Sequence, residues 1–176
     1  MNTLDTSRLL LRPPAVEDAE ALLEIHQDPE VVASKLVTLT EPLGGVDQAL
    51  RNIDRMARHW QTRGYGMWSV VENASGQVIG CVGYHHPDGW PGIDLGWIFH
   101  RSRWGNGFAT EACRAAIEWA WQNTRIDHII SLIAPDNIQS IRIATKIGES
   151  FERADVDPVH GEKVHVYGIR RRPPPA

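Results

Sequence analysis

The stretch from Ile93 to Phe151 decides the fold. It opens with an apolar run, Ile93-Asp94-Leu95-Gly96-Trp97-Ile98-Phe99-His100, and continues through a basic, glycine-bearing turn, Arg101-Ser102-Arg103-Trp104-Gly105-Asn106-Gly107-Phe108-Ala109. A helical pattern then extends to Asn123, and a second apolar run, from His128 to Ala134, ends in Pro135-Asp136-Asn137. The order strand, glycine turn, helix, strand is typical of a parallel βαβ unit.

The glycine turn is the segment in which binding chemistry is expected. Gly105 and Gly107 carry no Cβ, so the backbone here can approach a ligand closely. The amides that follow belong to the first turn of a helix and lack intrahelical acceptors, which makes them an anion site. Arg101 and Arg103 lie just before the turn and can add charge-assisted contacts to a phosphate. Glycine is also common in ordinary βα loops, so the turn alone does not specify a ligand.

Two other phosphate-binding motifs compete with this interpretation. A Walker-type loop is excluded because no Gly-Lys-Ser or Gly-Lys-Thr is present. The dinucleotide fingerprint requires a third glycine, and Thr110 occupies that position. An acidic residue, Asp136, does follow the next strand, so dinucleotide binding is weakened without being excluded.

Four motifs in order resemble the GNAT N-acetyltransferase superfamily, most closely its ribosomal-protein alanine N-acetyltransferase-like branch. They are Thr6-Ser7-Arg8-Leu9-Leu10-Leu11-Arg12, Asp94-Leu95-Gly96-Trp97, Trp104-Gly105-Asn106-Gly107-Phe108-Ala109-Thr110-Glu111-Ala112, and Asn137-Ile138-Gln139-Ser140 followed by Lys146-Ile147-Gly148. Phe151 comes two residues later than the branch pattern places its phenylalanine. The resemblance covers about Thr6 to Arg170, and it does not specify the substrate.

The resemblance implies one α+β domain over residues 6–170. The arginine- and proline-rich residues 171–176 are expected to form a disordered tail. Its central sheet would be mixed and mostly antiparallel, with strands four and five parallel and splayed and with helices on both faces. The implied activity is N-acetylation: an amine attacks the thioester of acetyl-CoA directly. The acetyl-CoA site would be built from Ile98, Phe99, Arg103, Trp104, Gly105, Asn106, Gly107, Phe108, Ala109, Thr110, Asn137 and Arg142. A backbone N–H from Trp97 to Phe99 would stabilise the oxyanion.

Asp94 is the candidate general base, because relatives of this kind often carry a glutamate at the matching position. It would take the proton of the amine directly or through water. Aspartate is the weaker base of the two unless burial raises its pKa. The alternative is that Asp94 is a solvated strand residue or a turn cap.

Ser140 is the second candidate catalytic residue. Many superfamily members place a tyrosine in the last helix to protonate the departing thiolate, and that position here is Ala144. In the ribosomal-protein branch the serine matching Ser140 is proposed for this role, although it is also a residue type that caps helices. Asn137, after Pro-Asp, is a typical helix N-cap that can also bond the pantetheine arm.

Outside this stretch, periodicity predicts the remaining elements. Strands are expected at 8–12, 67–72, 78–85, 149–156 and 163–170, and helices at 16–26, 46–63 and 138–147. Asp28-Pro29 is predicted to break the first helix. Residues 30–45 are not assigned, although the family resemblance places the acceptor site beside them. Trp60, Trp97 and Trp119 are expected in the core, whereas Trp90 packs there, borders the acceptor site or forms a lid.

Bulk properties exclude several classes of protein. The chain has 176 residues, 42% of them hydrophobic and 23% charged, as in a single globular domain. A net charge of −4 argues against a general nucleic-acid binder. The two cysteines, Cys81 and Cys113, are expected as small core residues rather than as a disulfide framework. A basic-then-apolar leader and a membrane-length apolar run are both missing, which predicts a cytoplasmic protein without a membrane partner.

The acceptor stays open at this level. A protein or peptide N-terminus is favoured by the branch resemblance, and a small-molecule amine such as an aminoglycoside, a polyamine or an amino-acid derivative is the alternative. A non-catalytic acyl-CoA-binding module is a further alternative, since the tyrosine is missing and Asp94 is short. His85-His86 suggests a metal, but no other ligand stands at metal spacing, so none is expected. Either a monomer or a homodimer fits the sequence.

Overall fold

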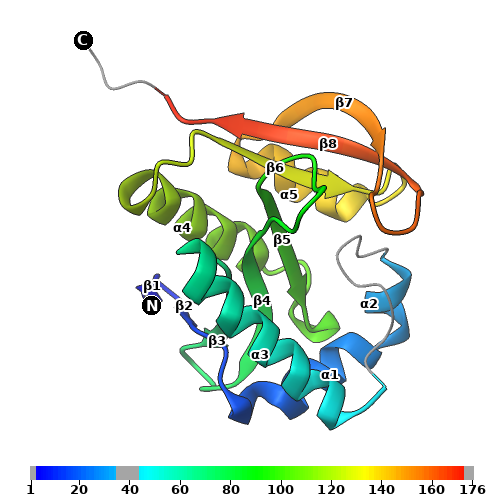
Figure 1. Ribbon diagram of the computed structural model, residues 1–176. Coiled ribbons are helices and arrows are strands. Elements are labelled where there is room, and N and C mark those ends of the chain that lie inside the picture. The colour runs from blue at the N-terminus through cyan, green and yellow to red at the C-terminus, as the bar shows by residue number, and fades with distance from the viewer. Residues whose placement is uncertain (1–2, 35–43, 173–176) are drawn as a thin grey trace.

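The computed structural model describes residues 3–34 and 44–172, in which one eight-stranded sheet runs through the molecule (Figure 1). The strand order is β1-β2-β3-β4-β5-β6-β8-β7. The strands are β1 (Leu4–Asp5), β2 (Leu9–Arg12), β3 (Met67–Glu72), β4 (Val78–His85), β5 (Asp94–Phe99), β6 (His128–Ile133), β7 (Ser150–Val156) and β8 (Lys163–Arg170). Each adjacent pair is antiparallel except β5 and β6, which are parallel as the βαβ pattern predicts.

The parallel pair separates after a short contact. Asp94 on β5 pairs with Ile130 on β6, and the amide of Ile130 donates to the carbonyl of Ile93 at 2.9 Å. By contrast, β5 pairs with β4 along its whole length, from Gly80–Phe99 to His85–Asp94. The sheet is therefore splayed on one edge of β5, which leaves room beside Trp97 and Ile98.

Helices cover both faces of the sheet, as predicted. They are α1 (Ala19–Gln27), α2 (Pro29–Ala33), α3 (Val46–Arg63), α4 (Phe108–Asn123) and α5 (Ile138–Ile147), with short 3₁₀ segments η1 (Val16–Asp18) and η2 (Arg101–Arg103). On one face, α4 buries Ala112, Cys113 and Ala116 against the sheet. On the other, α1 and α3 bury Leu22 and Ile53 around Cys81. Both cysteines are fully buried and unbonded, so their predicted place in the core is confirmed.

Several predicted boundaries match those observed. The strands at 67–72, 78–85 and 163–170 and the helices at 46–63 and 138–147 are found as expected. Gly64 ends α3 in the left-handed conformation with φ 75°. The predicted strand at 93–100 is one residue shorter at each end, and those at 8–12 and 149–156 each begin one residue later. An additional strand, β1, pairs with β2 before the predicted start of the domain.

The start of the helix predicted at 16–26 was wrong. Residues 16–18 form a 3₁₀ turn, and α1 begins only at Ala19. Asp28-Pro29 ends α1 but also starts α2, because the fixed φ of proline suits the first position of a helix. The carboxylate of Asp28 accepts from the amide of Glu30 at 2.9 Å and caps α2.

The first two residues of the predicted tail, Arg171 and Arg172, are among those described. The amide of Arg171 donates to the carbonyl of Asp127 at 2.8 Å. Residues 173–176 lie outside the described residues, as does most of the unassigned segment, over 35–43.

Tryptophan rings mark the core. Trp60, Trp68 and Trp119 meet edge to face, with ring centroids 4.8 to 5.4 Å apart. Trp60 and Trp119 are therefore in the core as predicted. The prediction for Trp97 was only partly right, because its ring packs against the core and also borders open space. Trp90 is buried in a smaller cluster beside Ile130.

Candidate active site

The glycine turn places its backbone as the sequence predicted. Gly105 and Gly107 have φ of 77° and 81°, which is the left-handed region that residues with a Cβ rarely adopt. Gly107 is the N-cap of α4, a helix of sixteen residues. The first amides of α4 therefore point out of the helix at its positive end, where an anion is stabilised.

The N-terminal strand holds this turn in place. Arg8 donates from Nη1 to the carbonyl of Asn106 at 3.0 Å, and its guanidinium lies 4.4 Å from the centre of the Phe108 ring. Glu111, in the first turn of α4, accepts from the side chains of Thr6, Ser7 and Arg8 and from the Arg8 amide at 2.6 to 3.1 Å. These hydrogen bonds lower the pKa of Glu111, although burial opposes them.

A cavity of about 330 Å³, here named the α4 cavity, opens between the glycine turn, the end of β5 and the start of α5. It brings together most of the predicted cofactor residues. Those that line it are Ile98, Phe99, Arg103, Trp104, Gly105, Gly107, Phe108, Ala109, Thr110, Asn137 and Arg142, together with the predicted catalytic residue Ser140. Asn106 is the one predicted cofactor residue outside this lining, because its side chain turns back to the carbonyls of Arg103 and Trp104.

Two of these lining residues are held by the sheet. Trp104 donates from its indole nitrogen to the carbonyl of Phe99 at 2.9 Å. Arg103 pairs with Glu72 of β3 at 3.0 Å, while its Nε has no hydrogen-bond partner among the described residues. The turn is thereby anchored to the strands on which the cavity is built.

The start of α5 presents Ser140 to the cavity. Asn137 caps the helix by accepting from the amide of Ser140 at 3.0 Å, and its side-chain nitrogen donates to the carbonyl of Ser34 at 2.6 Å. The predicted N-cap is thus confirmed, and it engages the Ser140 amide rather than the hydroxyl. Ala144, where many relatives place tyrosine, is fully buried.

Asp94 is buried, and its surroundings differ from those of an exposed strand residue. Its carboxylate accepts from the indole nitrogen of Trp90 and from the amide of Leu132, each at 3.2 Å. Burial raises the pKa of Asp94 to about 7, although both hydrogen bonds oppose the rise. Among the described residues that line the α4 cavity Asp94 does not appear.

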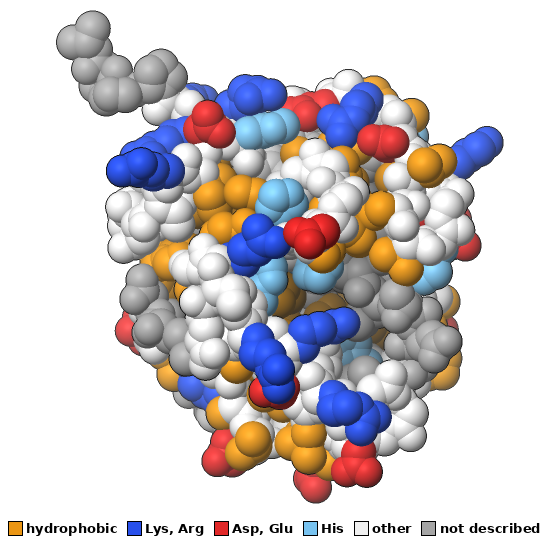
Figure 2. Space-filling view, viewed as in Figure 1, with side chains coloured by type: hydrophobic (Ala, Val, Ile, Leu, Met, Phe, Trp, Pro, Cys, Tyr) orange, Lys and Arg blue, Asp and Glu red, His pale blue; other side chains and the backbone are white. Residues whose placement is uncertain are grey.

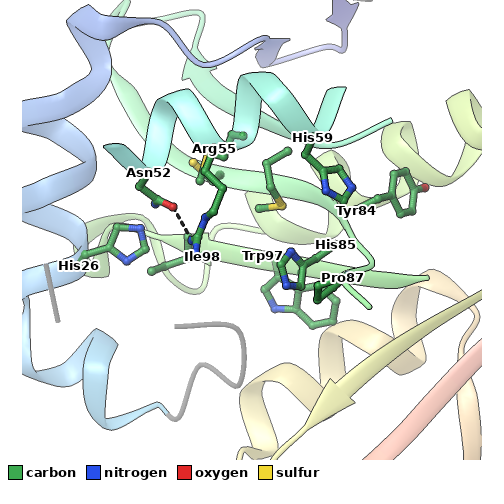
Figure 3. A pocket seen from close by; sticks show the side chains of 13 residues that line it. His26, Asn52, Arg55, His59, Tyr84, His85, Pro87, Trp97 and Ile98 are labelled. Carbon is green, nitrogen blue, oxygen red and sulfur yellow. Dashed lines mark hydrogen bonds between the residues drawn. The ribbon is translucent and has the colours of Figure 1, made fainter. Parts of the chain in front are cut away.

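A second cavity, of about 220 Å³, lies between α1, α3 and strands β3 to β5, and we name it the histidine cavity (Figure 3). Its polar lining residues are His26 of α1, Asn52, Arg55 and His59 of α3, and Tyr84 and His85 of β4. Met56, Met67, Cys81, Pro87, Gly96, Trp97 and Ile98 complete it. The space-filling view shows a hollow in this face of the molecule with histidine side chains in it and arginine or lysine side chains beside it (Figure 2).

The histidines of this cavity are held neutral. Burial lowers the pKa of His26 and of His85 to about 4 each, and it lowers that of His59 as well. Both ring nitrogens of His26, and Nε2 of His59, have no hydrogen-bond partner among the described residues. Sequence reasoning considered His85 only as half of a metal pair and missed His26 and His59, because these three residues come from separate elements.

The two cavities meet at one point of the sheet. Trp97 and Ile98 line both of them, on the part of β5 beyond its contact with β6. Asp94 lies at the start of the same strand, paired across the sheet with His85. One cavity is thus suited to an anion-bearing ligand and the other to a second molecule, with β5 between them.

Comparison with known proteins decides the family. The model of the acetyltransferase (GNAT) domain matches residues 8–150. The chain belongs to the GNAT acetyltransferase family. A protein of Bacillus licheniformis named "Uncharacterized N-acetyltransferase p20" is 31% identical over 173 residues, covering 95% of this chain and 94% of the relative.

Solved structures agree with this assignment. An acetyltransferase from Agrobacterium tumefaciens is 25% identical with a TM-score of 0.81, covering 97% of this chain and 95% of that one. The ribosomal L7/L12 α-N-protein acetyltransferase RimL, solved with coenzyme A, shares the fold at a TM-score of 0.80 and 15% identity, over 96% and 98% of the two chains. The GNAT protein described here is therefore an acetyl-CoA-dependent N-acetyltransferase, and the family resemblance of the sequence is confirmed.

The described residues contain neither a metal-binding cluster nor a membrane-spanning helix. Within residues 3–34 and 44–172, no cluster of three or more histidine, cysteine, aspartate or glutamate side chains is placed to hold a metal ion. None of the helices described is both long and apolar enough to cross a membrane.

Proposed function

We propose that this GNAT enzyme transfers the acetyl group of acetyl-CoA directly to a primary amine, with CoA in the α4 cavity and the amine in the histidine cavity. The observation that carries the proposal is the junction of the two cavities at Trp97 and Ile98. The amides at the start of α4 bind the pyrophosphate, and Arg103 and Arg142 add charge at the rim. The acetyl group then lies at the junction.

The chemical step needs a base, an oxyanion donor and an acid. The amine nitrogen attacks the thioester carbon, the C–S bond breaks, and an amide and CoA are formed. Asp94 accepts the proton of the amine through water, and its raised pKa of about 7 matches that role near neutral pH. A backbone N–H between Trp97 and Phe99 binds the oxyanion. Ser140 protonates the thiolate from the start of α5.

The ribosomal-protein branch resemblance suggests a protein or peptide N-terminus as the acceptor, whereas the histidine cavity itself favours the small-molecule alternative. Deprotonating an α-amine of pKa about 8 at pH 7 costs about 1.4 kcal/mol, whereas a lysine of pKa about 10.4 costs about 4.6 kcal/mol. A buried aspartate is sufficient for the first task. The second candidate is a small-molecule amine, which the modest 220 Å³ of the histidine cavity favours.

Release of free CoA, measured across a panel of peptides, polyamines, aminoglycosides and amino acids, tests the proposal. We expect acetyl-CoA to raise the melting temperature by several degrees, since a ligand at about 100 times its Kd stabilises by about 2.7 kcal/mol. NAD and ATP serve as controls and should leave the melting temperature unchanged. Tight acetyl-CoA binding without CoA release from any amine would overturn the proposal and favour an acyl-CoA-binding module.

A further inference from the structure

The described lining of the histidine cavity carries positive charge and no negative charge. Among its thirteen described lining residues there is one permanently charged side chain, Arg55, and no aspartate or glutamate. The remaining polar residues are neutral: Asn52, Tyr84 and the three histidines that burial keeps unprotonated. A ligand with several ammonium groups would find no counter-charge there, whereas an anionic group would.

Arg55 is not neutralised by a carboxylate within the described part of the chain. Its Nη2 donates to the amide oxygen of Asn52 at 2.6 Å, and Figure 3 shows the side chain extending from α3 toward Ile98. Arg58, one turn further along the same helix, contrasts with it, because it is paired with Asp54 at 2.7 Å. The guanidinium of Arg55 therefore keeps donors and charge for a ligand beside the junction of the two cavities.

The walls of the cavity suit an apolar ligand body with few polar groups. Met56, Met67, Pro87 and Trp97 supply apolar surface around the hollow. His26 is 3% exposed, and both of its ring nitrogens lack a hydrogen-bond partner among the described residues. An imidazole buried without a partner costs free energy that a ligand hydrogen bond would recover. The volume of about 220 Å³ suits a small molecule with one ring.

We propose that the acceptor is a small amine with an apolar body and a carboxylate, and that Arg55 binds this carboxylate while the amine faces Trp97 and Ile98. The inference rests on the proposed function, because it assigns the histidine cavity to the acceptor. In the reaction the amine nitrogen bonds to the acetyl carbon, the bond from that carbon to CoA sulfur breaks, and the amine proton leaves through the base. The product is an N-acetylated amine that retains its carboxylate. The geometry selects against polyamines and aminoglycosides, which are polycations.

Matched acceptors test the charge requirement. L-phenylalanine, L-phenylalaninamide and 2-phenylethylamine share one ring and differ at the carboxylate, and spermidine represents a polycation. CoA release is measured with the wild type, with Arg55→Leu, and with Arg58→Leu as the control on the same helix. For each amine, kcat/KM of the variant is divided by kcat/KM of the wild type, which removes the effect of the amine's own pKa. Loss of a charge-assisted hydrogen bond predicts that Arg55→Leu lowers kcat/KM for L-phenylalanine roughly 10- to 100-fold.

We expect Arg55→Leu to leave kcat/KM for 2-phenylethylamine and the affinity for acetyl-CoA nearly unchanged. Arg58→Leu should behave as wild type with every acceptor. Arg55→Lys should restore part of the L-phenylalanine activity, since it restores the charge without the planar fork. Preference for spermidine or a peptide N-terminus, or equal losses with all three phenyl compounds, would overturn this inference and leave acetyl transfer intact. No CoA release from any amine, with acetyl-CoA still bound, would instead overturn the proposed function.

Discussion

The α4 cavity and the histidine cavity share Trp97 and Ile98 but are built in opposite ways. The α4 cavity takes seven of its eighteen described lining residues from one segment, Arg103 to Thr110, which runs into the free amides at the start of α4. The histidine cavity takes side chains from α1, α3, β3, β4 and β5. Binding of a ligand by backbone amides depends on the conformation of the chain. Binding by side chains depends on the identity of each residue. We therefore expect the first cavity to keep one cofactor and the second to determine the acceptor.

The largest effect on turnover is expected at Asp94, which is not among the described lining residues of either cavity. Asp94→Asn removes the proposed base, and general base catalysis contributes about 10² to 10⁴ in rate. Turnover should fall at least about 100-fold, while the acetyl-CoA Kd measured by titration stays within about twofold. Wild-type kcat/KM should rise with pH through about 7 as Asp94 ionises, and this rise should vanish in the variant.

Glu149→Gln is the matched control for that substitution. Glu149 is also a buried acid, its pKa is raised well above the ordinary value by burial, and it accepts from Ser131. We assign it no catalytic role, so its variant should retain turnover. Wild-type turnover in Asp94→Asn, or an equal loss in Glu149→Gln, would remove Asp94 from the mechanism.

The raised pKa of Asp94 also predicts how the free energy of unfolding changes with pH. A carboxyl whose pKa is raised on folding binds more protons in the folded state than in the unfolded state. Its contribution to the unfolding free energy is therefore lost as pH rises from about 4 to about 7. Asp94→Asn removes this loss, so the variant should be more stable than wild type at pH 8, by up to about 4 kcal/mol. Denaturant melts at pH 5 and pH 8 measure the difference, and a variant less stable at both would contradict it.

Gly107→Ala tests the proposed cofactor site in the α4 cavity. A Cβ in the left-handed region costs about 1–2 kcal/mol, which either distorts the turn or unfolds part of it. We expect the acetyl-CoA Kd to rise about tenfold. Gly161→Ala is the control, because Gly161 has a φ of 70° in the β7–β8 loop and lines neither cavity within the described residues. Equal Kd changes in both variants would indicate a global rather than a local effect.

Ser140→Ala should have a smaller effect than Asp94→Asn. A thiolate with a pKa of about 8.5 leaves readily without a proton, so losing the acid should lower kcat by only about tenfold. The capping bond from the Ser140 amide to Asn137 is retained in the variant. Thr145→Ala, on the exposed side of the same helix, is the control. If stopped-flow measurements show unchanged CoA release in Ser140→Ala, another group protonates the thiolate.

The smallest expected effect concerns the support of the glycine turn. Glu111→Ala removes the acceptor of four hydrogen bonds from Thr6, Ser7 and Arg8. The free energy of unfolding should fall by roughly 1–3 kcal/mol, a few degrees in melting temperature. Glu118→Ala is the control on the same helix, because it removes an exposed carboxylate bonded to Gln122. Equal melting temperatures in the two variants would show that the N-terminal strand does not secure the turn.

The sequence was sufficient to predict those elements whose conformation depends on neighbouring residues alone. The apolar runs at 67–72 and 78–85 predicted β3 and β4 to the residue, and helical periodicity predicted α3, because the pleat and the helical turn are properties of a few consecutive residues. Asp28-Pro29 ends the first helix as predicted. The short α2 that begins at Pro29 was not assigned, because proline can end one helix and also begin the next.

The sequence by itself determined much of the α4 cavity, since the glycine turn, the start of α4 and the Asn137 cap are each short motifs whose geometry follows from backbone sterics. Only the tertiary structure brought the histidine cavity together. His26, Arg55 and His85 lie far apart in the chain, and no short-range rule relates them before α1, α3 and β4 pack together. Burial decided the state of Asp94 for the same reason, because the desolvation that raises its pKa to about 7 comes from the packed surroundings of Trp90 and Leu132.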